Sequence, residues 1–361
     1  MKRAGAETMI MQYLRQLVKD EQFDFSILVH GYDKGDYDDE IAGYNVPIYH
    51  VPVRGQHPLI YSHEVEKVLR EHPVDIIHCN MDSSCGDFLE IAQKCGISYR
   101  IAHSHTTKFQ AQKGIKNIIA KKSKKKIHDV VTERFACSEK AGKWLFEHDS
   151  FKIINNAIDL KCYLPNSKIR QEKYKELGIE EDNFVLGHIG RFCYEKNHKF
   201  LLRIFAQFKK KCLKSKLVLV GAGNLMEDIK SYAIELGIGQ DILFLGLRND
   251  IPDLLQVMDV FVMPSLFEGL PVSGIEAQAA GLPCLFADTI TPEICMTSHA
   301  KRIPLEDTEQ WVEALEQIPR IKNVEDAQEQ LRARGYDIVQ EAEKMKAYYI
   351  DIYESKEQEQ H

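Results

Sequence analysis

The alternation of two kinds of segment constrains the fold of this chain more than any other feature. Short runs rich in β-branched residues alternate with segments whose apolar residues recur at helical spacing. Buried strands that alternate with helices form parallel sheets covered by helices on both faces, so the sequence predicts the α/β class. The expected strands are 25–30, 47–51, 75–78, 99–102, 134–137 and 152–155, followed by 185–189, 217–220, 242–245, 260–263 and 284–287.

The length of the chain predicts two domains, because 361 residues exceed what one hydrophobic core usually serves. The polar segment 159–183, which contains Pro165 and Asn166, interrupts the alternation. We place the boundary there, with an N-terminal domain at 1–163 and a C-terminal domain at 164–340. The last segment, 341–361, is helical in character, and we expect it to pack back on the first domain.

Composition and charge exclude several classes of protein. No apolar run approaches the roughly 20 residues that span a bilayer, and the start "MKRAGAETMIM" lacks the apolar core of a secretion signal. We therefore expect a cytoplasmic protein. The formal net charge of −7 disfavours nucleic acid as a partner. The nine cysteines show no Cys-x-x-Cys spacing, which argues against a disulfide framework and a structural zinc site.

The N-terminus lacks one expected element. A glycine-containing turn, "RAGAE", leads into the helical segment "AETMIMQYLRQLV", and such a turn normally follows a buried strand. No strand precedes it in this sequence. We expect either that the start codon has been assigned too late or that the residues of a first, central strand are missing.

Two strand–loop–helix segments of the second half favour an anionic ligand. The segment "VLGHIGRFCYEKNHKFLLRIF" places Arg191 and Lys196 between a strand's carboxyl end and a helix's amino end, where a diphosphate is stabilised. In "LVLVGAGNLMEDI", Gly221 and Gly223 permit positive φ and close backbone approach to a ligand. Taken singly, the cations also fit solvated surface charges and the glycines fit any α/β turn.

A third segment, "SLFEGLPVSGIEAQAAGLP", carries two carboxylates. Glu268 lies in the loop after a strand, and Glu276 lies in the next helix, for which Pro271 suits the first turn. Both acids can face one cleft and accept hydrogen bonds from hydroxyls of a ribose or hexose, while the N–H groups of Gly269 and Leu270 remain available. For the acids alone, a capping role and a solvated helix face are the alternative.

These motifs, with "FLGLRNDIPDLLQVMDVFVMPSLFEGLPVSGIEAQAAGLP" and "CSEKAGKWLF", resemble the family-four retaining glycosyltransferases of the GT-B fold. They are most similar to bacterial enzymes of exopolysaccharide or capsule assembly, and the resemblance covers almost the whole chain. It implies two facing Rossmann-like domains. The second would hold a nucleotide-sugar donor, with a bias to UDP-sugars, and the first a glycan or polyprenyl-linked acceptor.

The resemblance also implies a role for each matched residue. Arg191 and Lys196 match the pair that neutralises the donor diphosphate. Glu276 matches the acid on the nucleotide ribose, and Glu268 the acid near the hydroxyls of the donor sugar. The residues that match the loop beside the nucleobase are Gly246, Leu247 and Arg248.

The first half supplies two histidines and a glycine. In "RIAHSHTTKF", His103 and His105 stand two apart at the end of a strand, so alternation sends both to one side. A strand-end histidine is often structural, but the resemblance implies a cleft histidine here, and "HTT" favours His105. Its expected role is hydrogen bonding near the donor sugar and the leaving phosphate. Gly5 matches a glycine loop near the donor diphosphate, where the family usually has Gly-Gly and this chain has Ala4.

The expected chemistry needs no metal and no cofactor. A sugar leaves a nucleoside diphosphate through an oxocarbenium-like state, so negative charge on the departing phosphate must be stabilised. Arg191, Lys196 and helix amino ends meet this need. No Asp-x-Asp stands where a divalent metal would be required, and we interpret "DYDDE" at 36–40 as an acidic surface turn. With retention, the leaving phosphate itself would accept the proton of the acceptor.

Seven lysines lie between residues 113 and 126, beside isoleucines at helical spacing. This pattern suits a helix on an anionic membrane and equally suits a solvated helix face. The polyprenyl-linked acceptor implied by the resemblance favours the membrane. The lysines are Lys113, Lys116, Lys121, Lys122, Lys124, Lys125 and Lys126.

Two other functions fit the same motifs. A nucleotide-sugar epimerase of this fold would turn over the donor without an acceptor. A non-catalytic protein would bind the donor without turnover, and the absent first strand is compatible with that reading.

Overall fold

The computed structural model describes residues 1, 5–54, 58–106, 115–319 and 322–359 of the chain. The chain folds into two compact units. Unit 1 comprises Met1–Ile158 and Gly335–His361, and unit 2 comprises Asp159–Arg334. The sequence placed the boundaries at 163/164 and 340/341.

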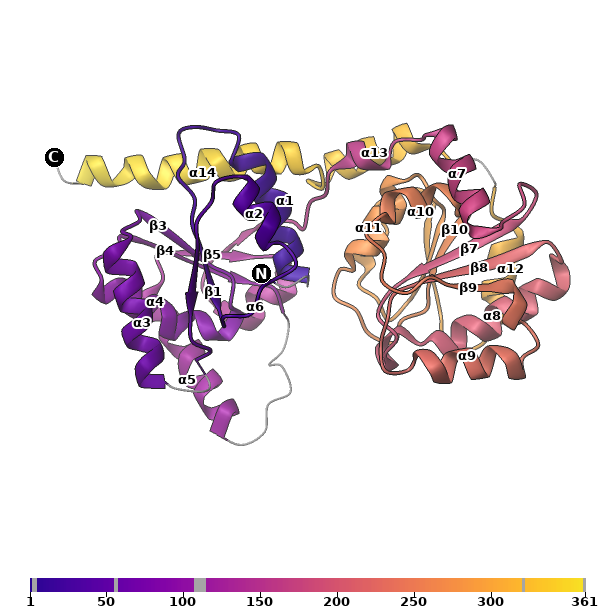
Figure 1. Ribbon diagram of the computed structural model, residues 1–361, viewed down its shortest axis with the longest axis horizontal. Helices are drawn as coiled ribbons and strands as arrows, with labels where there is room; N and C mark the ends of the chain where they lie inside the picture. The colour runs from indigo at the N-terminus through magenta and orange to yellow at the C-terminus, as the bar shows by residue number, and fades with distance from the viewer. Residues whose placement is uncertain (2–4, 55–57, 107–114, 320–321, 360–361) are drawn as a thin grey trace. The chain divides into compact units, whose positions relative to one another are not determined.

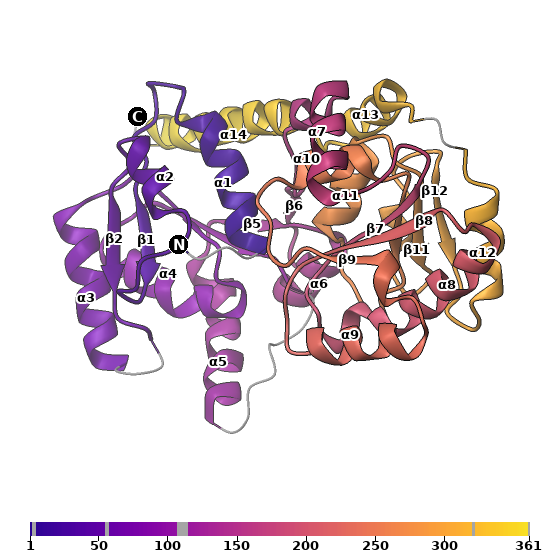
Figure 2. The same cartoon turned by 45° about the vertical axis from the view of Figure 1, so that its right-hand side comes forward.

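Unit 1 contains the first part of the alternating pattern and the last helix of the chain (Figures 1 and 2). Its helices are α1 (Gly5–Leu17), α2 (Asp38–Gly43), α3 (Pro58–Glu71), α4 (Cys85–Lys94), α5 (Ile115–Val130), α6 (Glu139–Phe146) and α14 (Ile338–Glu359), with the 3₁₀ turn η1 (Asp82–Ser84). Its strands are β1 (Ile27–His30), β2 (Ile48–Val51), β3 (Ile76–Cys79), β4 (Tyr99–Ser104), β5 (Glu133–Ala136) and β6 (Lys152–Ile153).

The strands of unit 1 form two parallel sheets, β1-β2 and β3-β4-β5-β6. Among the described residues, β1 pairs only with β2, and β3 pairs only with β4. Helix α1 precedes β1 and packs beside α14, as both views show (Figures 1 and 2). A core that includes Tyr13, Ile101, Phe135 and Ile338 joins these two helices to β4 and β5.

Unit 2 continues the alternation after the 3₁₀ turn η2 (Leu160–Tyr163). Its helices are α7 (Ser167–Leu177), α8 (His198–Lys211), α9 (Met226–Glu235), α10 (Ile251–Val257), α11 (Val272–Ala279), α12 (Glu309–Glu316) and α13 (Val324–Ala333). Its strands are β7 (Phe184–Ile189), β8 (Ser215–Val220), β9 (Ile242–Phe244), β10 (Val260–Met263), β11 (Cys284–Ala287) and β12 (Ala300–Ile303). Shorter 3₁₀ turns are η3 (Tyr194–Lys196), η4 (Gly239–Asp241) and η5 (Pro292–Ile294).

The six strands of unit 2 form one parallel sheet in the order β12-β11-β10-β7-β8-β9. Helices α8, α9 and α12 pack together, and α7, α10, α11 and α13 form a second group, so helices cover both faces (Figure 1). The α/β class with parallel sheets in two domains is therefore confirmed. The sequence missed β12, because its polar residues Lys301 and Arg302 give an edge strand no apolar run to reveal it.

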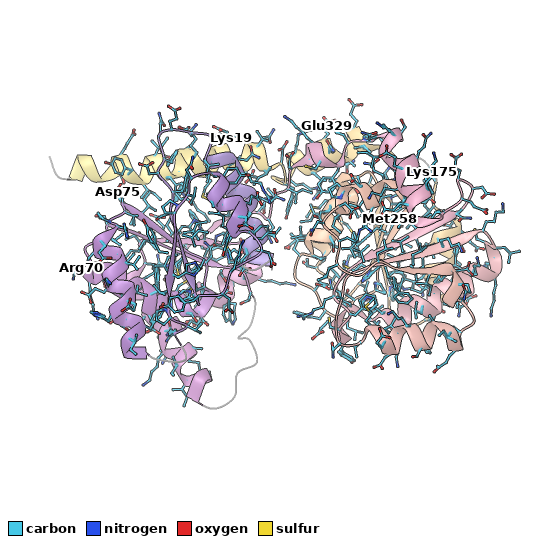
Figure 3. The ribbon with its side chains drawn as sticks, viewed as in Figure 1. Lys19, Arg70, Asp75, Lys175, Met258 and Glu329 are labelled. Carbon is cyan, nitrogen blue, oxygen red and sulfur yellow. The ribbon has the colours of Figure 1, made fainter. Side chains whose placement is uncertain are left out.

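Close packing beneath the sheet of unit 2 requires a glycine on its central strand. Met258 lies in the interior of this unit and is fully buried (Figure 3). A Cβ atom added at Gly187 of β7 would lie 2.0 Å from the Met258 sulfur. The small residue therefore leaves room for the side chain of Met258, which lies two positions before β10, the strand paired with β7.

Candidate functional site

The sheet of unit 2 reverses its strand order between β7 and β10. From β7 the chain builds outward through β8 and β9, and then returns to add β10, β11 and β12 on the other side. In open parallel sheets, ligands bind at such a reversal, outside the carboxyl ends of the strands. The loops that follow β7 and β10 are therefore the natural place for a binding site.

These two loops carry an ion pair. Lys196, in η3 after β7, places its Nζ 2.6 Å from Oε1 of Glu268, which lies in the loop after β10. The side chain of Lys196 is 15% exposed and that of Glu268 is 16% exposed. Arg191 lies in the same loop as Lys196 and is exposed. The structure thus brings Lys196 and Glu268 together and leaves the charge of Arg191 open to solvent.

Hydrogen bonds hold the two loops against each other. The backbone N–H of Leu266 donates to the carbonyl of Glu195 at 2.8 Å. The side-chain amide of Asn197 donates to the carbonyl of Pro264 at 3.1 Å, and Asn197 itself adopts a left-handed backbone with φ 54°. The Lys196–Glu268 pair is therefore built on a fixed backbone frame rather than on two independent loops.

Gly221 and Gly223 allow the loop after β8 to pack on the loop after β7. A Cβ atom at Gly221 would lie 2.1 Å from the carbonyl oxygen of Gly190, and one at Gly223 would lie 2.3 Å from that of Phe192. Gly221 also has a φ of +139°. The space that these residues leave is filled by neighbouring backbone, so packing alone is sufficient to require glycine at both positions.

Glu276 has a partner that the sequence did not reveal. The Tyr163 hydroxyl, from η2, donates to Oε1 of Glu276 at 2.9 Å. Burial raises the pKa of Glu276, and the bond from Tyr163 opposes that rise. Oε1 of Glu276 is therefore held by Tyr163. Its other oxygen, Oε2, takes part in none of the hydrogen bonds among the described residues.

The start of α11 presents unused donors. In the described part of the chain, the backbone N–H groups of Gly269 and Leu270 donate no hydrogen bond. No heavy atom lies within 4 Å of a Cβ atom built at Gly269. These groups stand just before the eight-residue helix α11, whose N-terminal end favours an anion.

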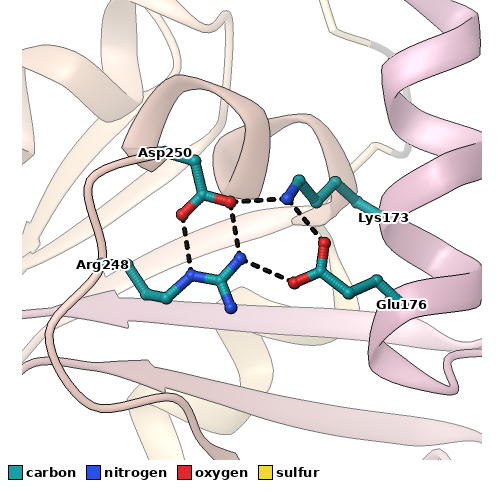
Figure 4. A network of polar contacts seen from close by, with 4 residues as sticks. All are labelled: Lys173, Glu176, Arg248 and Asp250. Atoms are coloured by element: carbon teal, nitrogen blue, oxygen red, sulfur yellow. Dashed lines mark hydrogen bonds and ion pairs between the residues drawn. The ribbon is translucent and has the colours of Figure 1, made fainter.

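Arg248 is held by its own neighbours (Figure 4). Its guanidinium donates to Asp250 at 2.7 Å and 2.6 Å and to Glu176 of α7 at 2.7 Å, and Lys173 bonds the same two acids. Bonds to Asp250 and Glu176 raise the pKa of Arg248. Of the segment expected beside a nucleobase, Gly246 and the 82% exposed Leu247 remain outside this network.

In unit 1, His103 and His105 lie at the carboxyl end of β4. Their rings stack with centroids 4.2 Å apart. His103 is fully buried, and His105 Nε2 lies 2.8 Å from Oδ1 of Asn80, which follows β3. The backbone N–H groups of His105 and Thr106 donate to Asp82 at 2.6 Å and 3.1 Å. The two histidines that strand alternation places on one side are therefore in contact.

Burial makes these rings hard to protonate. It lowers the pKa of His105 to about 4 and that of His78, which bonds His103, to about 3. The pKa of His103 is also well below its ordinary value, because of burial and then the neighbouring rings. These histidines are neutral near pH 7, so they can offer hydrogen bonds but no charge.

The remaining predicted residues lie elsewhere in unit 1. Gly5 is the exposed first residue of α1. Lys113 lies outside the described residues, and the side chain of Lys116 is not among those described. Lys121, Lys122 and Lys125 on α5 are exposed.

Two lysines of α5 are engaged by acids of unit 1. Lys124 Nζ lies 2.9 Å from Glu147 Oε1. Lys126 Nζ lies 2.8 Å from Asp87 and 2.6 Å from Glu90. Two of the seven lysines of the predicted basic segment are thus neutralised within the unit. None of the helices in the described ranges is long and apolar enough to cross a bilayer.

Sequence reasoning missed Tyr163, Asn80, Asp82 and His78. No local pattern marks them, because each acts on a residue from another strand or helix. Asn80 and Asp82 follow β3 directly, so strand-end position was the one available signal. Among the described residues, no group of three or more His, Cys, Asp or Glu is arranged to hold a metal ion.

Comparisons with known proteins match both parts of the chain. Residues 3–161 match the model described as Glycosyltransferase Family 4, and residues 169–337 match Glycosyl transferases group 1. EpsF of Bacillus subtilis (strain 168), which is named as a glycosyltransferase, is 37% identical over 303 residues, or 81% of this chain and 78% of EpsF. An Escherichia coli UDP-Gal:alpha-D-GlcNAc-diphosphoundecaprenol alpha-1,3-galactosyltransferase is 28% identical over 365 residues, or 94% of this chain and 92% of that protein.

A solved structure shares the whole architecture. HepE from Anabaena, crystallised in complex with UDP, superposes with a TM-score of 0.79 over 97% of each chain. Its sequence is 16% identical, so this likeness concerns the fold.

Proposed function

Since this chain is a glycosyltransferase of the GT-B fold and belongs to the family 4 glycosyltransferases, we propose that it transfers a hexose-type sugar from a UDP-sugar to a glycan or lipid-linked glycan. Transfer proceeds with retention of configuration and serves exopolysaccharide or capsule assembly. The names of two similar proteins support the substrates. The Escherichia coli relative is named for UDP-Gal and a diphosphoundecaprenol-linked sugar, and HepE was crystallised with UDP.

The observation that carries this proposal is the Lys196–Glu268 pair at the strand-order reversal of unit 2. A departing nucleoside diphosphate develops negative charge, and a fixed cation beside it stabilises the transition state more than the ground state. Lys196 supplies that cation together with the exposed Arg191. Glu268, aligned by Lys196, accepts hydrogen bonds from the hydroxyls of the sugar being transferred.

The nucleotide is bound by the remaining loops of unit 2. Glu276 accepts ribose hydroxyls, with Tyr163 holding its Oε1 and Oε2 turned to the ligand. The unused N–H groups of Gly269 and Leu270 bind phosphate oxygen. The loops at Gly221, Gly223 and Gly246 pass beside the nucleotide, and the exposed Leu247 offers apolar contact to the base. Arg248 braces its own loop against α7.

Unit 1 contributes the acceptor side of the reaction. His105 and His103 give neutral hydrogen-bonding groups, which suit sugar hydroxyls. Because these rings resist protonation, His105 orients the reacting groups and the leaving phosphate accepts the acceptor's proton. Gly5, the first residue of α1, keeps the role in diphosphate binding that the family resemblance implies. Arg191 and Lys196 supply the positive charge that stabilises the departing diphosphate, so the proposed reaction does not require a divalent metal.

An anionic membrane surface is the proposed partner of α5. The exposed Lys121, Lys122 and Lys125 lie on the same helix as the exposed Ile118 and Ile119. A lysine-rich helix that also exposes apolar side chains suits the interface of an anionic bilayer, where a lipid-linked acceptor would be found.

The test is turnover with a panel of UDP-sugars and an undecaprenyl-diphosphate-linked sugar as acceptor, with products followed by mass spectrometry and with EDTA present. We expect a glycosylated lipid product, and Lys196→Ala should lower turnover by a factor on the order of 10². Lys199→Ala is the matched control, because Lys199 is exposed on α8 three positions away and should leave turnover unchanged.

Three results would contradict the proposal. Donor epimerised or hydrolysed without acceptor would indicate a different enzyme. Donor binding without any turnover would indicate a non-catalytic protein. Equal turnover in Lys196→Ala and wild type would remove Lys196 from the reaction.

A further inference from the structure

The last helix of the chain is hydrogen-bonded to the histidine pair of unit 1. The Tyr349 hydroxyl on α14 lies 2.6 Å from Nδ1 of His78. His78 Nε2 lies 3.0 Å from Nδ1 of His103, whose ring stacks on His105. Tyr349, His78, His103 and His105 thus form a column of contacting polar rings, which we call the histidine column.

The direction of each hydrogen bond in the column follows from the tyrosine. Burial raises the pKa of Tyr349, so its hydroxyl keeps its proton. Within the described residues, this hydroxyl has no polar partner other than His78. A phenol hydroxyl is a stronger hydrogen-bond donor than the N–H of a neutral imidazole, and an imidazole nitrogen with a free lone pair is a stronger acceptor than a phenol oxygen. Tyr349 therefore donates to His78 Nδ1.

This direction fixes the tautomers of two imidazoles. A neutral imidazole carries one proton, so His78 with an acceptor at Nδ1 carries its proton at Nε2 and donates it to His103 Nδ1. His103 must then carry its own proton at Nε2. That atom is buried and has no partner among the described residues, so it is the one donor of the column still to be used.

Asn80 fixes the tautomer of His105 independently. Its Nδ2 donates to the carbonyl of His78 at 3.3 Å, which sets the orientation of the amide. Its Oδ1 then faces Nε2 of His105 at 2.8 Å and accepts a hydrogen bond from the N–H there. His105 is left with a lone pair at Nδ1, so this nitrogen can accept a hydrogen bond and cannot donate one.

We propose that Tyr349 is a positioning residue, which sets the tautomer of His103 through His78 and so orients the stacked His105 to accept a hydrogen bond from a sugar hydroxyl. This proposal rests on the proposed function, since the hydroxyl belongs to the transferred sugar or its acceptor. Helix α14 thus contributes to the site, although Tyr349 is 271 residues away from His78 in the sequence.

The experiment compares Tyr349→Phe with Tyr348→Phe. Tyr348 is the neighbouring tyrosine of α14, and its hydroxyl donates to Glu133, outside the column. The tautomers are measured by long-range ¹H–¹⁵N correlation spectra of protein labelled with ¹⁵N-histidine. The variants His78→Phe, His103→Asn and His105→Asn assign the signals, because each removes one ring.

We expect the wild type to show Nε2-protonated patterns for His78, His103 and His105. Tyr349→Phe should change the patterns of His78 and His103 and keep that of His105, which Asn80 fixes. Tyr348→Phe should change none. In turnover, Tyr349→Phe should lower kcat roughly tenfold with the donor KM unchanged, because misplaced groups cost rate without weakening a nucleotide held by unit 2.

Each arm can overturn the proposal separately. Unchanged tautomers in Tyr349→Phe would end it, and this spectrum needs no donor, so it stands whether or not the proposed function holds. A changed tautomer with unchanged kcat would show that the column serves folding alone. His78→Phe keeps an aromatic ring and breaks both bonds, so it must reproduce the kcat effect of Tyr349→Phe if the relay acts as described.

Discussion

The candidate sites of the two units are built in opposite ways. In unit 2, charged side chains sit on loops that directly follow strands, and the Lys196–Glu268 ion pair joins neighbouring loops. In unit 1, neutral rings are buried and held by hydrogen bonds, one of them from Tyr349 to a histidine 271 positions away. Charge can be supplied by short local motifs, whereas a fixed ring tautomer needs packing from a distant part of the chain.

The largest difference between the units should appear in acid. Burial lowers the pKa of four histidines in unit 1, among them His78 to about 3 and His105 to about 4, and of two, His188 and His198, in unit 2. Histidine has a pKa of about 6.5 in the unfolded chain. Below this pH the unfolded chain binds protons that the folded chain does not, so the free energy of unfolding decreases as the pH is lowered. Each such histidine lowers the free energy of unfolding by at most about 1.4 kcal/mol for each pH unit of acidification.

We therefore expect unit 1 to lose more stability than unit 2 between pH 7 and pH 5. The chain has two tryptophans, Trp144 in α6 of unit 1 and Trp311 in α12 of unit 2. 5-Fluorotryptophan labelling gives one ¹⁹F signal from each, so urea unfolding can be followed for each unit in one sample. His78→Phe should flatten the pH dependence of the Trp144 signal alone. An equal loss of stability at both signals would contradict the predicted difference between the two units.

A second prediction separates the acids of unit 2. Glu268→Gln should lower kcat by a factor on the order of 10², because in the proposed function this carboxylate meets a sugar that gains positive charge in the transition state. Glu276→Gln should raise the donor KM roughly tenfold with kcat unchanged, because the ribose does not change during the reaction. Tyr163→Phe should raise the same KM roughly threefold, as expected for one lost hydrogen bond.

Steady-state kinetics with saturating donor distinguish these effects. The control is Phe208→Leu, a change in the buried face of α8 away from both acids. It shows how a general loss of stability affects kcat and the donor KM. The reverse pattern, with Glu276 governing kcat and Glu268 only KM, would mean that the two acids have exchanged roles.

The last prediction concerns α5 of unit 1. Replacing Lys121 and Lys122 by Ala should weaken binding to vesicles that contain phosphatidylglycerol by a factor on the order of ten, since each lysine near an anionic surface contributes attraction. The matched control removes Lys124 and Lys126, which changes the net charge equally but breaks ion pairs with Glu147, Asp87 and Glu90. That control should lower the melting temperature and bind vesicles nearly as wild type does. Equal binding loss in both pairs would indicate a response to net charge alone.

The same contrast explains what could be predicted from the sequence. The α/β class follows from hydrophobic period, and residues that end neighbouring parallel strands meet at one edge, so the proximity of Lys196 and Glu268 follows from strand order. Tyr163 and Tyr349 have no such signal. Each meets its partner through tertiary packing, at separations of 113 and 271 residues. Likewise, the ion pairs that engage Lys124, Lys126 and Arg248 depend on acids from other elements, which periodicity does not reveal.

Unit 1 is made from two stretches of chain, with unit 2 between them. During translation, unit 2 can complete its sheet while the core around Ile101 and Phe135 still lacks the side chains of α14 that cover it. The nascent chain therefore exposes this apolar surface until the final helix has left the ribosome. Because Tyr349 belongs to α14, the histidine column is completed only after that helix has been synthesised.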